Sequence, residues 1–120
     1  MAIINYQLTT AQLNAVTVPA TKQYAITNIM VCNTYDPTGA SPDLHDATFT
    51  MHLIPDGDSL TNAVTTVIKV LSLPAGETFT FDSEKIVLGA GDMLSFTATS
   101  ETPPGAGLTD LAVTVSYLEV

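Results

Sequence analysis

The sequence predicts an all-β protein, a single antiparallel β-sandwich that is jelly-roll-like and has about eight strands. The chain has 120 residues, enough for one domain with one core. Apolar residues alternate with threonine and serine over many short segments, and clusters of Pro, Gly and Asp separate these segments. Because no segment offers a helix that could cover a sheet, two sheets must cover each other or one must close into a barrel. We favour the sandwich.

Four segments show the alternation most clearly. In residues 47–54, Phe49 and Met51 lie on one face of the predicted strand, while Thr50 and His52 lie on the other. Threonine is the most frequent residue, and its branched side chain fits a half-buried pleated surface. The same pattern predicts strands over residues 77–81, 92–99 and 111–117. The positions expected to point between the two sheets include Phe49, Phe79, Phe81, Leu94 and Phe96.

The remaining elements follow from weaker patterns. Less regular strands are expected over residues 3–8, 14–18, 24–33 and 64–73. The last two are apolar on both faces in places, as in strands buried on two sides or facing a neighbouring subunit. Turn residues mark positions 18–20, 54–58, 73–76 and 89–92. Residues 36–46 and 100–107 are expected to be long loops, and residues 9–15 are the candidate for a helical turn.

Residues 1–12 are expected to stand apart from a single sandwich domain at residues 13–120. The first eight residues carry no charge, which is unusual for a segment left in water. We expect this segment to dock on a neighbouring chain as an added strand, and an ordinary edge strand of its own sheet is the alternative. The candidate interface residues are Ile3, Ile4, Tyr6 and Leu8, together with Tyr35 beside the long loop.

The balance of charged residues limits the kinds of partner that the chain can bind. Three lysines, no arginine and 12 acidic residues give a formal net charge of -9. Affinity for a nucleic-acid backbone comes from clustered Lys or Arg that displace counterions, and anionic membrane surfaces attract the same residues. We therefore expect neither nucleic acid nor a membrane among the partners.

The only cysteine, Cys32, cannot form a disulfide within the chain, which fits assembly in a reducing cytoplasm. It follows Val31 inside a predicted strand, so we expect a buried, inert thiol and not a nucleophile. The first residues lack the pattern of a secretory signal, and no apolar run is long enough to predict a membrane span.

The two histidines are the other candidates for chemistry. His52 lies on the polar face of its strand and is predicted to be a surface residue, solvated or facing an interface. His45 lies between Asp43 and Asp46 in the long loop, a set that offers two carboxylates and an imidazole to a metal. Adjacent loop carboxylates more often bond their own backbone in turns, and we favour that interpretation.

No sequence motif predicts catalysis. Residues 56–59 begin like a calcium loop but lack its later ligands, so a turn is expected there. Phosphate-binding loops, nucleophile elbows and paired cysteine motifs do not occur in the sequence. We therefore expect no enzyme activity, no cofactor and no metal.

A sugar-binding module is the alternative for a β-sandwich, because such modules stack exposed aromatic rings on sugars. The chain has no tryptophan and four tyrosines, of which Tyr35 borders a loop and Tyr117 is expected to point inward. Two or three coplanar, exposed tyrosine rings on one face would favour this alternative.

Five segments carry a pattern that extends from residue 13 to the end of the chain. They are VTVPATKQYAITNIMVCNT at residues 16–34, FTMHLIP at 49–55, LPAGET at 73–78, IVLGAGDMLSF at 86–96 and LAVTVSYLEV at 111–120. In this pattern the chain resembles small bacteriophage virion structural proteins. It departs from them at Thr21, where the pattern has glycine, and in the additional residues 36–46.

The resemblance implies a part of a virion, assembled in the host cytoplasm. Capsid decoration, or cement, is the leading expectation, in which the protein stabilises the head through subunit interfaces. The expected partners are other virion proteins, above all the major capsid protein. A homotrimer would match the three-fold sites of an icosahedral shell. The alternatives are a tail, collar or tail-fibre component, or a glycan-binding module on the virion.

Overall fold

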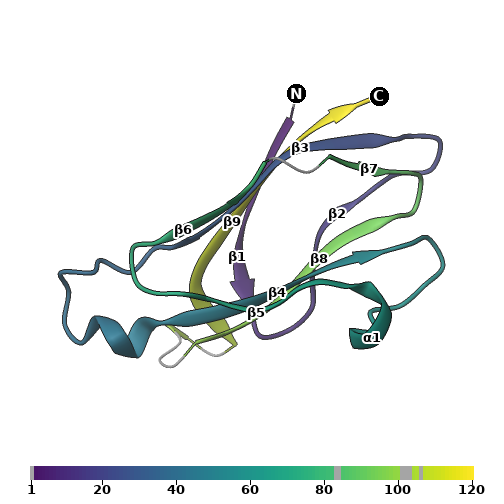
Figure 1. The fold of residues 1–120 in the computed structure, drawn as a ribbon. Helices are drawn as coiled ribbons and strands as arrows, with labels where there is room; N and C mark the ends of the chain where they lie inside the picture. The colour runs from purple at the N-terminus through teal and green to yellow at the C-terminus, as the bar shows by residue number, and fades with distance from the viewer. Residues whose placement is uncertain (1, 83–84, 101–103, 106) are drawn as a thin grey trace.

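The alternating segments form nine β-strands among the residues that the structure describes, which are 2–82, 85–100, 104–105 and 107–120. In this computed structural model the strands make two antiparallel sheets that pack face to face (Figure 1). The sheet here called the β1 sheet contains β1 (Ala2–Thr9), β9 (Leu108–Glu119), β3 (Tyr24–Asn33), β6 (Thr78–Phe81) and β7 (Ile86–Leu88). The β2 sheet contains β2 (Leu13–Thr17), β8 (Met93–Ser100), β4 (Ala47–Ile54) and β5 (Thr66–Leu73).

The strand order is that of a jelly roll. It runs β1-β9-β3-β6 in one sheet and β2-β8-β4-β5 in the other. Two Greek-key connections produce such an order, because the chain crosses repeatedly from one sheet to the other. The ninth strand arises because β6 and β7 pair with successive stretches of the same side of β3. The predicted fold class is therefore confirmed.

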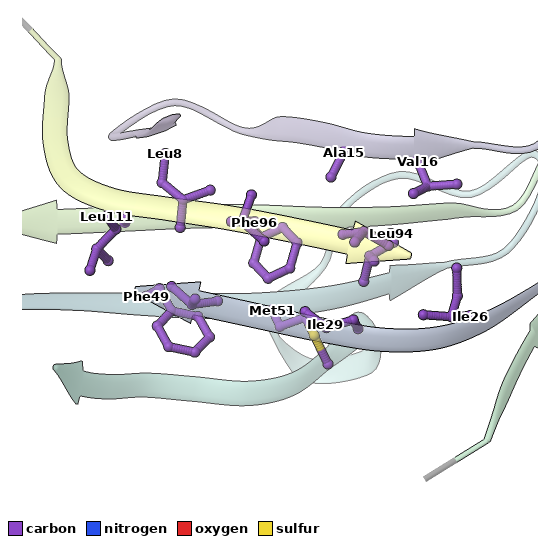
Figure 2. Close-up of a cluster of buried hydrophobic side chains, with 14 of the residues drawn as sticks. Leu8, Ala15, Val16, Ile26, Ile29, Phe49, Met51, Leu94, Phe96 and Leu111 are labelled. Atoms are coloured by element: carbon purple, nitrogen blue, oxygen red, sulfur yellow. The ribbon is translucent and has the colours of Figure 1, made fainter. Parts of the chain in front are cut away.

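Alternation determines which side chains fill the space between the sheets. Phe49 of β4 and Phe96 of β8 are 1% and 0% exposed, and their ring centroids lie 6.2 Å apart. Figure 2 shows both rings between strands, together with Leu94, Met51 and Ile29. The inward positions predicted for Phe49, Leu94 and Phe96 are confirmed.

Phe79 and Phe81 also point toward the core but are only half-buried. Both belong to β6, which lies at the edge of the β1 sheet, so one side of each ring lacks a neighbouring strand. The centroid of the Phe79 ring still lies 5.7 Å from that of Phe49, a distance typical of favourable aromatic pairs.

Three local predictions need correction. Residues 9–15 form no helical turn, because residues 13–17 are strand β2 and bury Val16 in the core. The strand expected from residue 64 begins at Thr66, after a one-turn helix α1 (Asn62–Thr65). The long loop at residues 36–46 contains a short 3-10 helix, η1 (Pro42–His45).

The second predicted loop, residues 100–107, is described only in part. Ser100 is the last residue of β8, and β9 begins at Leu108. Residues 101–103 and 106 lie outside the described residues.

Strand β5 departs from a regular ladder. Its pairing with β4 shifts register twice, between the partners of Phe49, Met51 and His52. Val70 has a φ of 51°, a left-handed conformation that β-branched residues rarely adopt. Its backbone N–H donates to the Thr50 hydroxyl at 3.1 Å. Such bulges are common in edge strands, where they hinder unwanted pairing.

Within the part of the chain that the structure describes, no helix has the length and apolar character needed to cross a membrane.

The buried aromatic pair gives the first prediction. Phe96→Ala should lower the free energy of unfolding by about 3 to 5 kcal/mol, because it removes a large side chain from a closely packed core. Val64→Ala is the matched control, since Val64 is 76% exposed and its truncation should cost less than about 0.5 kcal/mol. Urea titration with an unchanged slope measures both values. A loss below about 1 kcal/mol for Phe96→Ala would contradict the packing described above.

Candidate functional site

The N-terminal strand β1 is an edge strand of its own sheet. It pairs with β9 from Ala2 opposite Tyr117 to Thr9 opposite Leu108. This is the alternative that the sequence left open for residues 1–12. Among the described strands, β9 is the only partner of β1. The backbone groups along the other side of β1 can therefore accept a further strand.

The predicted interface residues of β1 differ in how far they are exposed. Ile3 is 64% exposed and Tyr6 39% exposed, so both remain candidates. Ile4 is half-buried and packs against the core. Leu8 is 0% exposed, which corrects its assignment as an interface residue. It is a core residue because the strand turns it inward, and the Thr109 hydroxyl donates to its carbonyl oxygen at 3.0 Å.

Charged residues are almost excluded from the described strands. Only Lys69, Asp110 and Glu119 carry charge there, and Glu119 pairs with Lys22 at 3.4 Å. The other charged residues that the structure describes lie in turns, loops and η1. The broad faces of the sandwich are therefore nearly uncharged, although the chain has a net charge of -9.

The outer face of the β1 sheet shows this most clearly. Its exposed apolar side chains are Ile3, Met30, Val87 and Leu118. Cys32 lies on the same face, opposite Ala112 of β9. It is half-buried, so the expectation of a fully buried thiol is wrong. The outward phase of β3 places it there, while its neighbour Val31 is 0% exposed in the core.

Tyr35 belongs to a cluster that ties the long loop to β9. Its ring stacks on His45 with centroids 3.4 Å apart and planes 4° apart. Nδ1 of His45 donates to a carboxylate oxygen of Asp110 at 2.8 Å. The Tyr35 hydroxyl donates to the carbonyl oxygen of Ala40 at 2.6 Å. His45 thus pairs with a distant aspartate, and not with Asp43 or Asp46 as the metal alternative supposed.

Asn33 is a buried residue whose role the sequence did not indicate. It is 1% exposed, and its side-chain amide donates to the carbonyl oxygens of His45 and Leu73 at 2.8 and 2.9 Å. Its side-chain oxygen accepts the backbone N–H of Tyr35 at 3.1 Å. The side-chain amide of Asn33 therefore fixes both ends of the long loop and the first residue of the turn at residues 73–76. An imidazole that is oriented by an aspartate, as His45 is by Asp110, can serve as a general acid or base. In this structure the contacts of His45 hold the long loop in place.

His52 is buried, contrary to the prediction of a surface residue. It is 3% exposed and lies opposite Ser95 of β8 on the outer face of the β2 sheet. Its Nδ1 is 3.1 Å from the hydroxyl of Thr65 and 3.4 Å from that of Thr66. Burial, and to a lesser degree the positive charge of Lys69, lower the pKa of its imidazole. The alternation predicted the correct face, but α1 covers it.

Two of the predicted turns, at residues 54–58 and 89–92, are joined by hydrogen bonds. Asp58 N–H donates to the Pro55 carbonyl oxygen at 3.0 Å, so residues 55–58 form the expected turn. The Asp92 carboxylate accepts the backbone N–H groups of Asp56 and Gly89, each at 2.9 Å. Across the described ranges, no group of three or more His, Cys, Asp or Glu side chains is placed to hold a metal ion.

The tyrosines form no shared sugar-stacking face. Tyr24 and Tyr117 have ring centroids 4.5 Å apart, with planes tilted by 30°, and both pack against the core. Tyr35 stacks on His45 beyond the other end of β3, and Tyr6 lies on β1. Sugar stacking therefore has no coplanar platform on the described tyrosines.

A polar hollow lies beside β4 and β8. It has a volume of about 450 Å³ and is lined by Asp46, Thr48, Ser72, Thr99 and Ser100. The Thr48 and Thr99 hydroxyls hydrogen-bond each other at 2.6 Å across the two strands. Hydroxyls and one carboxylate are groups that hydrogen-bond hydroxyl-rich ligands.

Comparisons with protein-family models, with curated proteins and with solved structures found no match.

The Tyr35 cluster gives a second prediction. His45→Ala and Asp110→Ala should each lower the free energy of unfolding by about 1 to 2 kcal/mol, because each breaks a half-buried, charge-assisted hydrogen bond. In the double variant the losses should fall short of additivity by at least about 0.5 kcal/mol. Asp43→Ala is the control on the exposed side of η1 and should change stability by less than about 0.5 kcal/mol. Additive losses in urea titrations would show that the two side chains are not coupled.

Proposed function

We propose that this chain is a structural protein of a bacteriophage particle and acts as a capsid decoration protein that stabilises the head. The observation that carries the proposal is the open edge of β1, an uncharged strand whose far side can accept a strand from another chain. Its partner in the proposal is the major capsid protein or another virion protein.

The sequence of β1 lacks the features that normally protect an edge. It contains no proline and no charged residue, and its register shifts only near its end, between Gln7 and Thr9. Natural edge strands use charge, proline and bulges to prevent pairing. Strand β5, one of the two edges of the β2 sheet, has such features in Lys69 and its two bulges. The other edge strands, β2, β6 and β7, are uncharged but have only 5, 4 and 3 residues, and short edges are themselves protected. The 8-residue β1 is therefore favoured as the docking edge.

The surface chemistry agrees with an assembly component. Copies of a chain with a net charge of -9 repel each other unless they meet through uncharged surface. The outer face of the β1 sheet offers such surface, with Ile3 at 64% and Val87 at 56% exposure. A trimer around a three-fold site of the shell would use this face or the β1 edge.

The fold and the sequence resemblance support the same function. Jelly rolls occur in viral capsid domains, although they also occur in lectins and enzymes, so the fold alone does not determine function. The resembling segments coincide with strands and their turns, since residues 86–96 cover β7, a turn and the start of β8. A tail, collar or fibre component remains the alternative location. The polar hollow beside Asp46 is where a glycan would bind if the chain is a receptor-binding module.

The location is tested on phage particles purified from a culture that produces this chain. Gold-labelled antibody to the protein should mark DNA-filled heads and leave purified tails unlabelled. Label on tails or fibres would replace decoration by the alternative location. Sedimentation equilibrium of the isolated protein should give three times the chain mass, and a monomer at all concentrations would contradict the trimer.

The docking edge is tested by placing charge on it. Ile3→Lys should weaken binding to particles that lack the protein by at least about tenfold, because a lysine on an edge strand disfavours pairing. Val67→Lys is the matched control, a valine 45% exposed on β5, and should bind like the unmodified chain. Co-sedimentation with particles measures both affinities. Equal loss in the two variants, or no loss in either, would contradict docking through β1.

A further inference from the structure

A second, smaller buried layer lies outside the sandwich core. The even-numbered positions of β4 point away from the core, yet Thr50, His52 and Ile54 are only 7%, 3% and 1% exposed. Ile54 does not belong to the cluster of side chains between the two sheets. Helix α1 forms a cover over His52, with the Thr65 hydroxyl 3.1 Å from its Nδ1, while Thr50 receives the backbone N–H of Val70 from the bulge of β5. Figure 1 shows α1 beside the end of β4.

Few bonds hold this cover in place. The hydroxyls of Thr65 and Thr66 reach Nδ1 of His52 at 3.1 and 3.4 Å. The ammonium group of Lys69 donates to the side-chain oxygen of Asn62 at 2.8 Å. The helix itself is a single turn, too short to be stable without such contacts. The imidazole of His52 is therefore a principal anchor of α1.

The hydroxyl protons determine how the imidazole bonds. The Thr65 hydroxyl donates to the carbonyl oxygen of Thr61 at 2.9 Å, and the Thr66 hydroxyl donates to that of Asn62 at 2.7 Å. Each hydroxyl has one proton, so both accept from His52, whose Nδ1 carries the hydrogen. A further proton must then enter at Nε2 of a side chain that is only 3% exposed.

Within the described part of the chain, no carboxylate hydrogen-bonds to His52 or balances that proton. Helix α1 presents Thr65, β8 presents Ser95 in register, and β5 presents Thr66 and Lys69. Of these groups only Lys69 is charged, and its charge repels an imidazolium. A protonated His52 is therefore stable only when the cover moves away and water reaches the ring.

We propose that α1 is an acid-released cover, which detaches from the outer face of the β2 sheet when His52 takes up a proton. Release exposes His52 and the threonine hydroxyls that contact it, and so creates a new polar surface on the outer face of the β2 sheet. The core between the two sheets contains neither His52 nor α1, so the sandwich stays folded. This device does not depend on the proposed place of the protein in a virion.

The direction of the pH effect follows from linkage. The pKa of His52 is lowered in the closed state and returns to an ordinary value, near 6.5, when the cover opens. Closure is therefore fully favoured above pH 6.5, and it weakens as the pH falls from 6.5 toward the lowered pKa of the closed state. Between pH 7.5 and 5.5 the opening constant should rise, by at most about tenfold, and the limit is reached when the closed state takes up no proton in this range.

Amide hydrogen exchange tests this proposal on the full chain. The amides of Val64 and Thr65, which donate to the Thr61 carbonyl oxygen, report opening of α1. After correction for the intrinsic pH dependence of exchange, their opening constants should rise from pH 7.5 to 5.5, by at most about tenfold. Those of Val113 and Val115 in the core should stay constant. His52→Gln keeps a hydrogen-bonding group but cannot titrate, so it should remove the pH dependence. His45→Gln changes the other histidine and should retain it.

A second measurement applies if His52→Gln does not fold. The titration of His52 in the unmodified chain, followed by NMR, should have its midpoint below 6.5 and coincide with the opening of α1. Lys69→Gln should raise that midpoint, because it removes the repelling charge and keeps a donor for Asn62. The proposal fails if the Val64 and Thr65 amides open equally at both pH values, or if His52→Gln retains the full pH dependence.

Discussion

The structure depends on one constraint, which is that a small set of large side chains must fill the space between two sheets. Phe49 and Phe96 from the β2 sheet meet Ile29 and Val113 from the β1 sheet, and all four are almost fully buried. Their strands can supply these residues only if every second position is apolar. Such packing is sensitive to shape, so the register of the central strands is determined by it. The loops and edges are then free to serve other purposes.

The same constraint shapes the surface. The outward positions of the described strands hold mainly Thr, Ser, Asn, Ala and a few apolar side chains, and most acidic residues lie in turns, loops and η1. The result is a sandwich with charged ends and uncharged faces. Repulsion between copies acts mainly through the ends, while the faces and the β1 edge can approach another chain. This distribution of charge supports the proposed role at interfaces between chains.

Sequence alternation predicted the strands well, because the local pattern alone decides which side chains of a strand point inward. It could not predict contacts between distant segments. Leu8 belongs to the core because β1 pairs with β9, a contact over about a hundred positions that residues 1–12 do not reveal. The pairing of His45 with Asp110 and the role of Asn33 have the same origin. For His52 the predicted face was correct, but alternation says nothing about a segment that folds over that face.

The bulges of β5 explain how that cover reaches His52. Regular pairing continued from Phe49 opposite Leu71 would place Ile68 opposite His52, on the outer face. The two register shifts place Ile68 opposite Met51, where it packs on the core, and bring Thr66 beside the imidazole. The left-handed conformation of Val70 is part of this shift and costs about 1 to 3 kcal/mol in such regions. Strand β5 therefore does two things through the same bulges. It protects the edge of the β2 sheet against pairing, and it brings the Thr66 hydroxyl to the buried His52.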